Sequence, residues 1–179
     1  MDVEALIDEV IGREGGYSNH AADRGGATRW GITEAVARAH GYRGEMRQFP
    51  RTDAVAIYAR VYWCRPGFDR ISEYAPEIAA ELFDTGVNMG PGVAVSFLQR
   101  ALNALNRGAG DYADIVPSVR VDDATVAALK SFLAKRVPNG ERILMKALEA
   151  LQGERYLDLA ERRPANEAFL YGWLTNRLG

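Results

Sequence analysis

The composition of this 179-residue chain excludes several classes of protein before any motif is considered. Hydrophobic residues make up 47% and charged residues 26%, as in an ordinary globular protein, so neither disorder nor a fibrous repeat is expected. The net charge of −2 makes nucleic acid a poor partner, and no apolar run approaches the roughly 20 residues that cross a bilayer, so no membrane insertion is expected. The length allows one core of ordinary size, or one core with a subsidiary lobe.

The N-terminal residues predict a helix, a polar loop and a hairpin, in that order. Apolar residues recur at helical spacing over residues 3–11, and Gly15-Gly16 supplies a stop. Residues 15–33 are rich in Gly, Asn, Asp, Ser and Thr and end in a short mixed run, which favours a loop followed by a small β-hairpin. Thr33 resembles the N-cap of a helix that continues to about Ala39.

The rest of the chain predicts helices with short breaks and a loop over residues 107–117. High helical content with one hairpin indicates a mainly α fold. The Gly90–Gly92 turn is the best candidate boundary, between lobes 1–90 and 91–179, although one continuous domain is the alternative. The further helices are expected to begin at Thr52-Asp53, at Pro76-Glu77, after Gly90-Pro91-Gly92, at Asp122 or Asp123, after Pro138-Asn139-Gly140, and near Asn166.

Three features of the sequence concern the cellular context, disulfides and metals. The acidic start, from Met1 to Glu4, lacks the basic and apolar regions of a signal peptide, so we expect synthesis in the cytoplasm. The single cysteine, Cys64, excludes an intramolecular disulfide and is expected to be a small buried hydrophobe rather than a reactive thiol. His20 and His40 are too few for a convincing site, so no metal is expected.

The first helix turns one carboxylate toward its apolar side. A rotation of 100° per residue puts Glu14 near the middle of the apolar stripe, whereas Asp8 and Glu9 lie well away from it. Partial desolvation and the negative end of the helix dipole should both raise the pKa of Glu14. A carboxylic acid that keeps its proton near neutral pH is what protonation of a glycosidic oxygen requires. The alternative is a solvated helix-end carboxylate, or one paired with Arg13.

The loop that follows Glu14 is dense in groups that hydrogen-bond a sugar or a water. Its glycines let the backbone approach a ligand closely. A second carboxylate, Asp23, lies across the loop, and two carboxyl groups that flank one bond are the usual apparatus of glycoside hydrolysis. The alternative for Asp23 is an Asx-turn that only shapes the loop. The polar and aromatic groups of the loop are Tyr17, Ser18, Asn19, Asp23, Thr28, Arg29 and Trp30.

The run Glu14-Gly15-Gly16-Tyr17-Ser18-Asn19, with the run from Asp23 to Thr33, resembles the signature of glycoside hydrolase family 108. The members of that family are bacterial and prophage muramidases, some of them named secretion activator proteins. The family's catalytic acid falls on Glu14. The order of Glu14, Asp23 and Thr28 also resembles the layout of phage-type lysozymes. One departure is Arg24, where the family more often has Pro.

The resemblance continues over nearly the whole chain. Tyr62-Trp63 and the segment from Phe83 to Pro91 resemble the family's middle region. The late run Phe169-x-x-Gly172-Trp173-x-x-Asn176-Arg177 resembles its associated C-terminal peptidoglycan-binding region. The segment from Gly110 to Asp123 departs from the Asp-Gly-x-x-Gly turn common in such regions. The second lobe is therefore either a wall-binding module or a purely helical scaffold.

The resemblance implies a lysozyme-like fold with its hairpin beside an active-site cleft. It implies a muramidase that hydrolyses the β-1,4 bond between N-acetylmuramic acid and N-acetylglucosamine in peptidoglycan, with no cofactor. Glu14 is then the general acid, and Asp23 or Thr28 is a second catalytic or water-positioning group. Asp84 is equally well explained by pairing with an Arg within its helix. The expected substrate-binding residues are Tyr17, Asn19, Trp30, Tyr62, Asp84 and Asn88.

Two other functions fit the same residues. The expected partners follow from the substrate. A lytic transglycosylase also needs one acid, and a catalytically silent secretion-helper protein could share the scaffold. The expected partner is the glycan strand of peptidoglycan, in the periplasm after release. Without a signal peptide, access to the wall would need a holin or a dedicated exporter.

Overall fold

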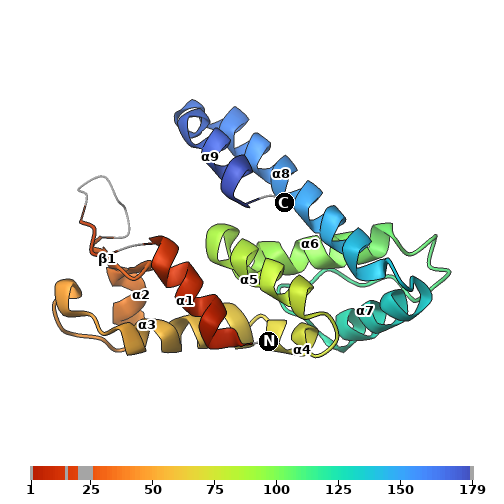
Figure 1. Cartoon of the computed structure of the whole chain (residues 1–179), viewed down its shortest axis with the longest axis horizontal. Helices are drawn as coiled ribbons and strands as arrows, with labels where there is room; N and C mark the ends of the chain where they lie inside the picture. The colour runs from red at the N-terminus through yellow and green to blue at the C-terminus, as the bar shows by residue number, and fades with distance from the viewer. Residues whose placement is uncertain (1, 15, 20–25, 178–179) are drawn as a thin grey trace. The chain divides into compact units, whose positions relative to one another are not determined.

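The computed structural model describes residues 2–14, 16–19 and 26–177, except the side chains of residues 13, 14, 176 and 177. The chain divides into two compact units, residues 1–65 and residues 66–179. The described residues form a mainly α fold with a single two-stranded antiparallel sheet, which confirms the predicted lysozyme-like fold class (Figure 1).

Helix α1 (Val3–Glu14) opens the first unit and ends where the sequence predicts. The Asp2 carboxylate accepts hydrogen bonds from the backbone N–H groups of Glu4 (3.0 Å) and Ala5 (3.3 Å), so it caps the first turn. The helix packs against α3 (Arg51–Ile57) and η2 (Tyr58–Cys64), and the Asp8 carboxylate forms an ion pair with Arg51. Its buried side chains are Ile7, Val10 and Ile11.

The predicted hairpin is present as β1 (Thr28–Arg29) and β2 (Ile32–Thr33). Thr28 pairs with Thr33 and Arg29 with Ile32. The two turn residues, Trp30 and Gly31, have φ angles of 55° and 72°, the left-handed values that a two-residue hairpin turn requires. Helix α2 (Glu34–Ala39) follows at once, and the Thr33 hydroxyl accepts a hydrogen bond of 3.4 Å from the N–H of Val36. The predicted N-cap is therefore confirmed.

The second half of this unit differs from the sequence prediction in detail. A 3₁₀ turn, η1 (Met46–Gln48), was not expected, and α3 begins one residue before Thr52. Beyond Ile57 the helix widens into the π-helix η2, in which the N–H of Arg65 donates to the carbonyl of Arg60 at 3.0 Å. Trp63 takes the buried position there and Cys64 is exposed, so the expectation of a buried cysteine is wrong.

The second unit is built on the pair α5 and α6, which lie side by side, with α8 packed against both (Figure 1). Helix α4 also packs on α5, while α7 and α9 each contact α8. All the predicted helices are present, and the short α4 is an addition. The elements are α4 (Phe68–Ser72), α5 (Pro76–Met89), α6 (Pro91–Ala104), α7 (Asp123–Lys135), α8 (Gly140–Arg162), η3 (Pro164–Asn166) and α9 (Glu167–Arg177).

The predicted loop after α6 is held by two polar residues of that helix and by Asn106 just beyond its end. Gln99 and Asn103 are four residues apart, so they share one face of the helix. Asn103 exchanges two hydrogen bonds with the backbone of Ile115, at 2.9 and 2.8 Å. Asn106 is buried, and its amide donates to the carbonyl of Tyr112 at 2.7 Å. An irregular segment is thereby held in place by side chains rather than by a helix or sheet.

The compact units part at residue 65, whereas the sequence places its boundary at Gly90. Because α5 packs against α4 and α6, residues 66–90 belong with the second compact unit. The division into a catalytic lobe 1–90 and a second lobe 91–179 concerns function as well as packing and stays a prediction. None of the helices that the structure describes is both long and apolar enough to cross a membrane.

Candidate active site

Glu14 is the last residue of α1, at the point where the helix gives way to the glycine-rich loop. Its backbone position agrees with the predicted helix end. Its side chain lies outside the described residues, and so does the whole of Asp23. The roles predicted for these two carboxylates therefore stay predictions.

A backbone bridge closes the loop that follows Glu14. The N–H of Ser18 donates to the carbonyl of Thr28 at 2.9 Å, and the N–H of Thr28 donates to the carbonyl of Ser18 at 2.8 Å. The bridge puts the neighbours of Ser18, Tyr17 and Asn19, alongside the first strand of the hairpin. Since Ser18 follows Glu14 by four residues, their Cα atoms are at most about 14 Å apart. Three predicted site residues, Tyr17, Asn19 and Thr28, thus gather within reach of the end of α1.

Trp30 is fixed at the tip of the hairpin by contacts on two sides. Its indole Nε1 donates to the carbonyl of Phe49 at 3.0 Å, and the Tyr58 hydroxyl donates to its backbone carbonyl at 3.2 Å. The guanidinium of Arg29 lies 5.1 Å from the centre of the indole ring. The ring is half-buried, so part of an oriented aromatic surface remains accessible, as a sugar-stacking residue requires.

The two predicted tyrosines of the first unit have different surroundings. The Arg47 guanidinium lies 4.3 Å from the ring centre of Tyr17, a cation–π contact that orients the phenol. Tyr62 belongs to η2, with its ring centre 5.4 Å from that of Tyr58. Burial raises the pKa of the Tyr62 phenol, which keeps it a neutral hydrogen-bond donor. Arg47 was not expected near the site, because its proximity depends on the packing of η1 against β1.

Asp84 and Asn88, predicted to bind substrate, lie one turn apart on α5 and contact each other. The Asn88 amide donates to the Asp84 carboxylate at 3.0 Å and to the Asp84 backbone carbonyl at 2.9 Å. The sequence left open a pairing of Asp84 with an arginine, and this alternative stays a prediction. The Asn88 amide orients the Asp84 carboxylate.

Glu81 is a candidate that the sequence did not single out. Burial, the nearby Asp84 carboxylate and the more weakly felt Glu149 raise the pKa of Glu81 to about 7, against a lowering by the hydrogen bond from Thr85. That hydrogen bond runs from the Thr85 hydroxyl to the carboxylate at 3.3 Å. A perturbed carboxyl beside Asp84 is a common feature of functional sites and of structural clusters alike. In the sequence, Glu81 could have been noticed because it directly precedes Leu82, an apolar residue of α5 that is buried.

A cavity of about 320 Å³ lies beside Asn88 in the second unit. Trp173 of α9 and Tyr156 of α8 contribute to its wall, and their ring centres are 5.3 Å apart. Phe169 stacks at 6.2 Å from Trp173. The aromatic part of the late sequence motif therefore anchors α9 on α8. The side chains of Asn176 and Arg177, from the same motif, lie outside the described residues.

The described elements form a lysozyme-like, mainly α fold with a helical C-terminal portion. Residues 7–90 of the chain match the family model described as Glycosyl hydrolase 108, and residues 93–178 match the family model described as Predicted Peptidoglycan domain. The two families together support a glycosidase that acts on peptidoglycan. Within the described residues, no cluster of three or more His, Cys, Asp or Glu side chains could hold a metal ion.

Among solved structures, the chain is similar to SagA of Brucella abortus. The two share 24% sequence identity over 94% of this chain and 95% of that chain, with a TM-score of 0.58. This likeness supports the fold and is not used for the site. A comparison with curated proteins found no match.

Proposed function

We propose that this protein is an N-acetylmuramidase that hydrolyses the β-1,4 bond between N-acetylmuramic acid and N-acetylglucosamine, with Glu14 as general acid. One observation supports it above the others. Glu14 ends α1 directly before the loop that the Ser18–Thr28 bridge closes against the hairpin, inside the segment matched by the glycosyl hydrolase family.

The position of Glu14 suits proton donation to a leaving oxygen. The C-terminal end of a helix carries partial negative charge, which disfavours an ionised carboxylate. The acid would protonate the glycosidic oxygen while positive charge develops on the sugar ring. We propose that Asp23 or Thr28 either positions the attacking water or stabilises the positive charge on the sugar ring. The backbone of Thr28 is already fixed by its two hydrogen bonds to Ser18.

Each unit carries residues that we propose as sugar contacts. In the first unit, the oriented ring of Trp30 offers an apolar face, and Tyr17, Asn19 and Tyr62 offer polar groups. In the second unit, Asp84 and Asn88 present an oriented carboxylate and amide, groups that hydrogen-bond sugar hydroxyls. A mixture of aromatic and polar groups such as that of the first unit is usual in ligand sites.

The substrate determines where the protein acts. Since peptidoglycan lies in the cell wall, we propose that cleavage takes place there, in the periplasm. The expected route through a holin or a dedicated exporter has no support in the fold or in the two family matches.

Product analysis tests the reaction type directly. The purified protein is incubated with peptidoglycan and the released fragments are analysed by mass spectrometry. A muramidase gives products with a reducing-end N-acetylmuramic acid, formed by addition of water. Fragments that end in 1,6-anhydro-muramic acid would instead identify a lytic transglycosylase. Intact polymer after prolonged incubation would indicate a silent helper protein.

A further inference from the structure

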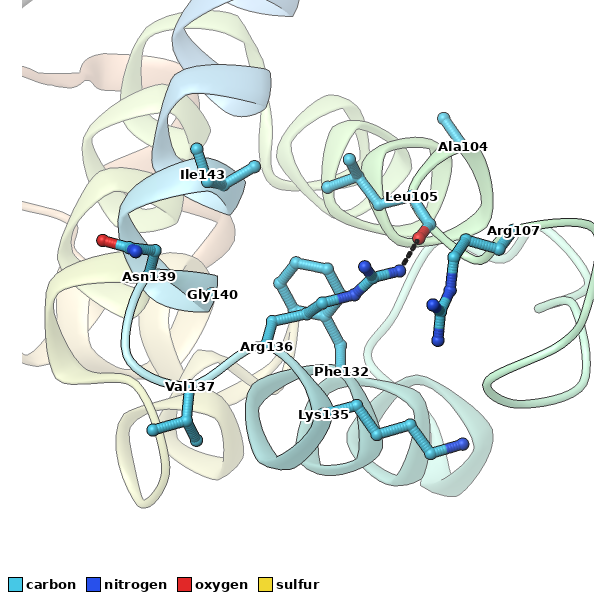
Figure 2. Close-up of a pocket in the computed structure, with 10 residues that line it drawn as sticks. All are labelled: Ala104, Leu105, Arg107, Phe132, Lys135, Arg136, Val137, Asn139, Gly140 and Ile143. Atoms are coloured by element: carbon cyan, nitrogen blue, oxygen red, sulfur yellow. Dashed lines mark hydrogen bonds between the residues drawn. The ribbon is translucent and has the colours of Figure 1, made fainter.

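A second cavity, of about 570 Å³, lies in the second unit where three helix ends meet (Figure 2). The end of α6 provides Ala104 and Leu105, the end of α7 provides Phe132 and the residues that follow it, and the start of α8 provides Gly140 and Ile143. None of the residues of the proposed glycosidase site lines it.

Three cations on the cavity wall share one buried carboxylate. The Asp111 side chain is only 1% exposed, and it lies 2.8 Å from Arg136 and 3.8 Å from Lys135. Arg107 binds the same carboxylate through Nε at 3.1 Å and through a second nitrogen. The hydrogen bond from Arg107 lowers the pKa of Asp111, so the carboxylate is ionised at neutral pH. Three positive charges against one negative leave two uncompensated, and no described residue that lines the cavity is acidic.

Arg136 has hydrogen-bonding capacity left over. Figure 2 shows its guanidinium between Leu105 and Phe132, with one nitrogen donating to the Leu105 carbonyl at 3.2 Å. Its Nε is buried and has no hydrogen-bond partner among the described residues. A buried donor without a partner has an energetic cost. An anion or a water held in the cavity would remove that cost.

The first turn of α8 adds to the positive character of the cavity. No side chain caps this turn at Asn139, so its N–H groups remain available to a ligand. A Cβ atom on Gly140 would lie 2.9 Å from the Cβ of Arg136, so only glycine lets the helix start this close to the arginine. Gly140 and Arg136 both line the cavity.

The remaining wall is apolar. Phe132 is buried, and two further apolar lining residues, Val137 and Ile143, are 76% and 39% exposed. The cavity thus combines uncompensated cations with an apolar edge. This combination suits an organic anion that bears a small apolar group better than it suits a neutral sugar.

We propose that this cavity binds a free carboxylate of the peptide stem of peptidoglycan, with an alanine methyl group of the stem against Ile143. The choice of polymer rests on the proposed function. The cavity would give the protein a contact with the peptides that branch from the glycan, separate from the contacts that position the sugar bond for cleavage.

Binding of soluble stem peptide, released from peptidoglycan by an amidase, tests the proposal by calorimetry. The full-length Glu14→Gln chain is used, so that cleavage does not interfere. Lys135→Gln and Ala104→Trp, one removing a charge and the other filling the cavity, should each weaken binding at least about 10-fold. The matched controls are Lys146→Gln and Ala134→Trp, at exposed positions away from the cavity, and they should bind as the parent does.

The anion requirement is tested with the same peptide after amidation of its carboxyl groups, which should bind at least about 10-fold more weakly. Equal binding of the amidated peptide, or unchanged binding by Ala104→Trp, would overturn the proposal. A second assay separates the cavity proposal from the glycosidase assignment. It compares the cleavage of peptide-free glycan strands by the wild-type chain and by Ala104→Trp, which should cleave them equally. Cleavage without peptide binding refutes the cavity proposal alone, and peptide binding without cleavage refutes the glycosidase alone.

Discussion

The amide of Gln152 on α8 donates a hydrogen bond of 2.9 Å to the hydroxyl of Thr85 on α5, and both side chains are buried. The Thr85 hydroxyl in turn donates to the Glu81 carboxylate at 3.3 Å. A polar chain therefore crosses the contact between two helices of the second unit. It fixes which faces of α5 and α8 meet and it holds an acid beside Asp84.

Replacing Thr85 by Val should destabilise the protein by about 1–3 kcal/mol, because the buried Gln152 amide would lose its partner. The free energy of unfolding from denaturant titration measures this loss. Thr175→Val is a matched control on α9, where the hydroxyl is exposed and bonds only the Tyr171 carbonyl. Equal losses in the two variants would show that the buried chain contributes nothing.

Glu81 should make stability depend on pH. Its pKa in the folded chain is about 7, above the ordinary value of 4.5, so the folded protein holds this proton more tightly than the unfolded chain does. The stability that the proton provides is complete below pH 4.5 and is lost as the pH rises through about 7, by at most about 3 kcal/mol. Unfolding curves between pH 4 and 8 should show this fall in the wild type and a smaller one in Glu81→Gln. The same slope in both chains would rule out Glu81 as the cause.

Gly67 should tolerate no side chain. Its φ is +89°, and a Cβ atom would lie 2.9 Å from the Cβ of Val121, whose N–H donates to the carbonyl of Pro66 at 2.8 Å. Gly67→Ala should therefore cost about 2 kcal/mol or more, from backbone strain and a clash together. Gly108→Ala is the control, since its φ is +66° but no atom lies within 4 Å of the added carbon. Thermal unfolding that ranks Gly108→Ala as the more damaging change would contradict this explanation.

The parts of the fold that the sequence predicts are those fixed by local interactions. The hairpin turn at Trp30 and Gly31, the Thr33 cap and the Asp122 cap of α7, whose carboxylate accepts from the N–H of Thr125 at 2.8 Å, each involve residues within a few positions. The π-helix η2 and the short α4 were missed. The first has no local signal, and the second depends on Gly67 meeting Val121 from a distant segment.

The candidate sites divide in the same way. The helix end at Glu14 and the polar loop could be found from spacing and residue type. The raised pKa of Glu81 could not, because it depends on Asp84 and on burial against another helix. The cationic cavity could not either, since Arg107, Asp111 and Arg136 come together only when the loop after α6 packs against α7.

The rate at which Glu14→Gln cleaves purified peptidoglycan tests the central proposal most directly. The substitution keeps the shape of the side chain and removes the proton donor. Glu4→Gln, on the exposed first turn of the same helix, controls for the loss of a carboxylate. The proposal predicts at least about a 10²-fold loss of rate for Glu14→Gln, with an unchanged unfolding curve, and wild-type rate for Glu4→Gln. Cleavage by Glu14→Gln at near the wild-type rate would contradict the assignment of Glu14 as the general acid.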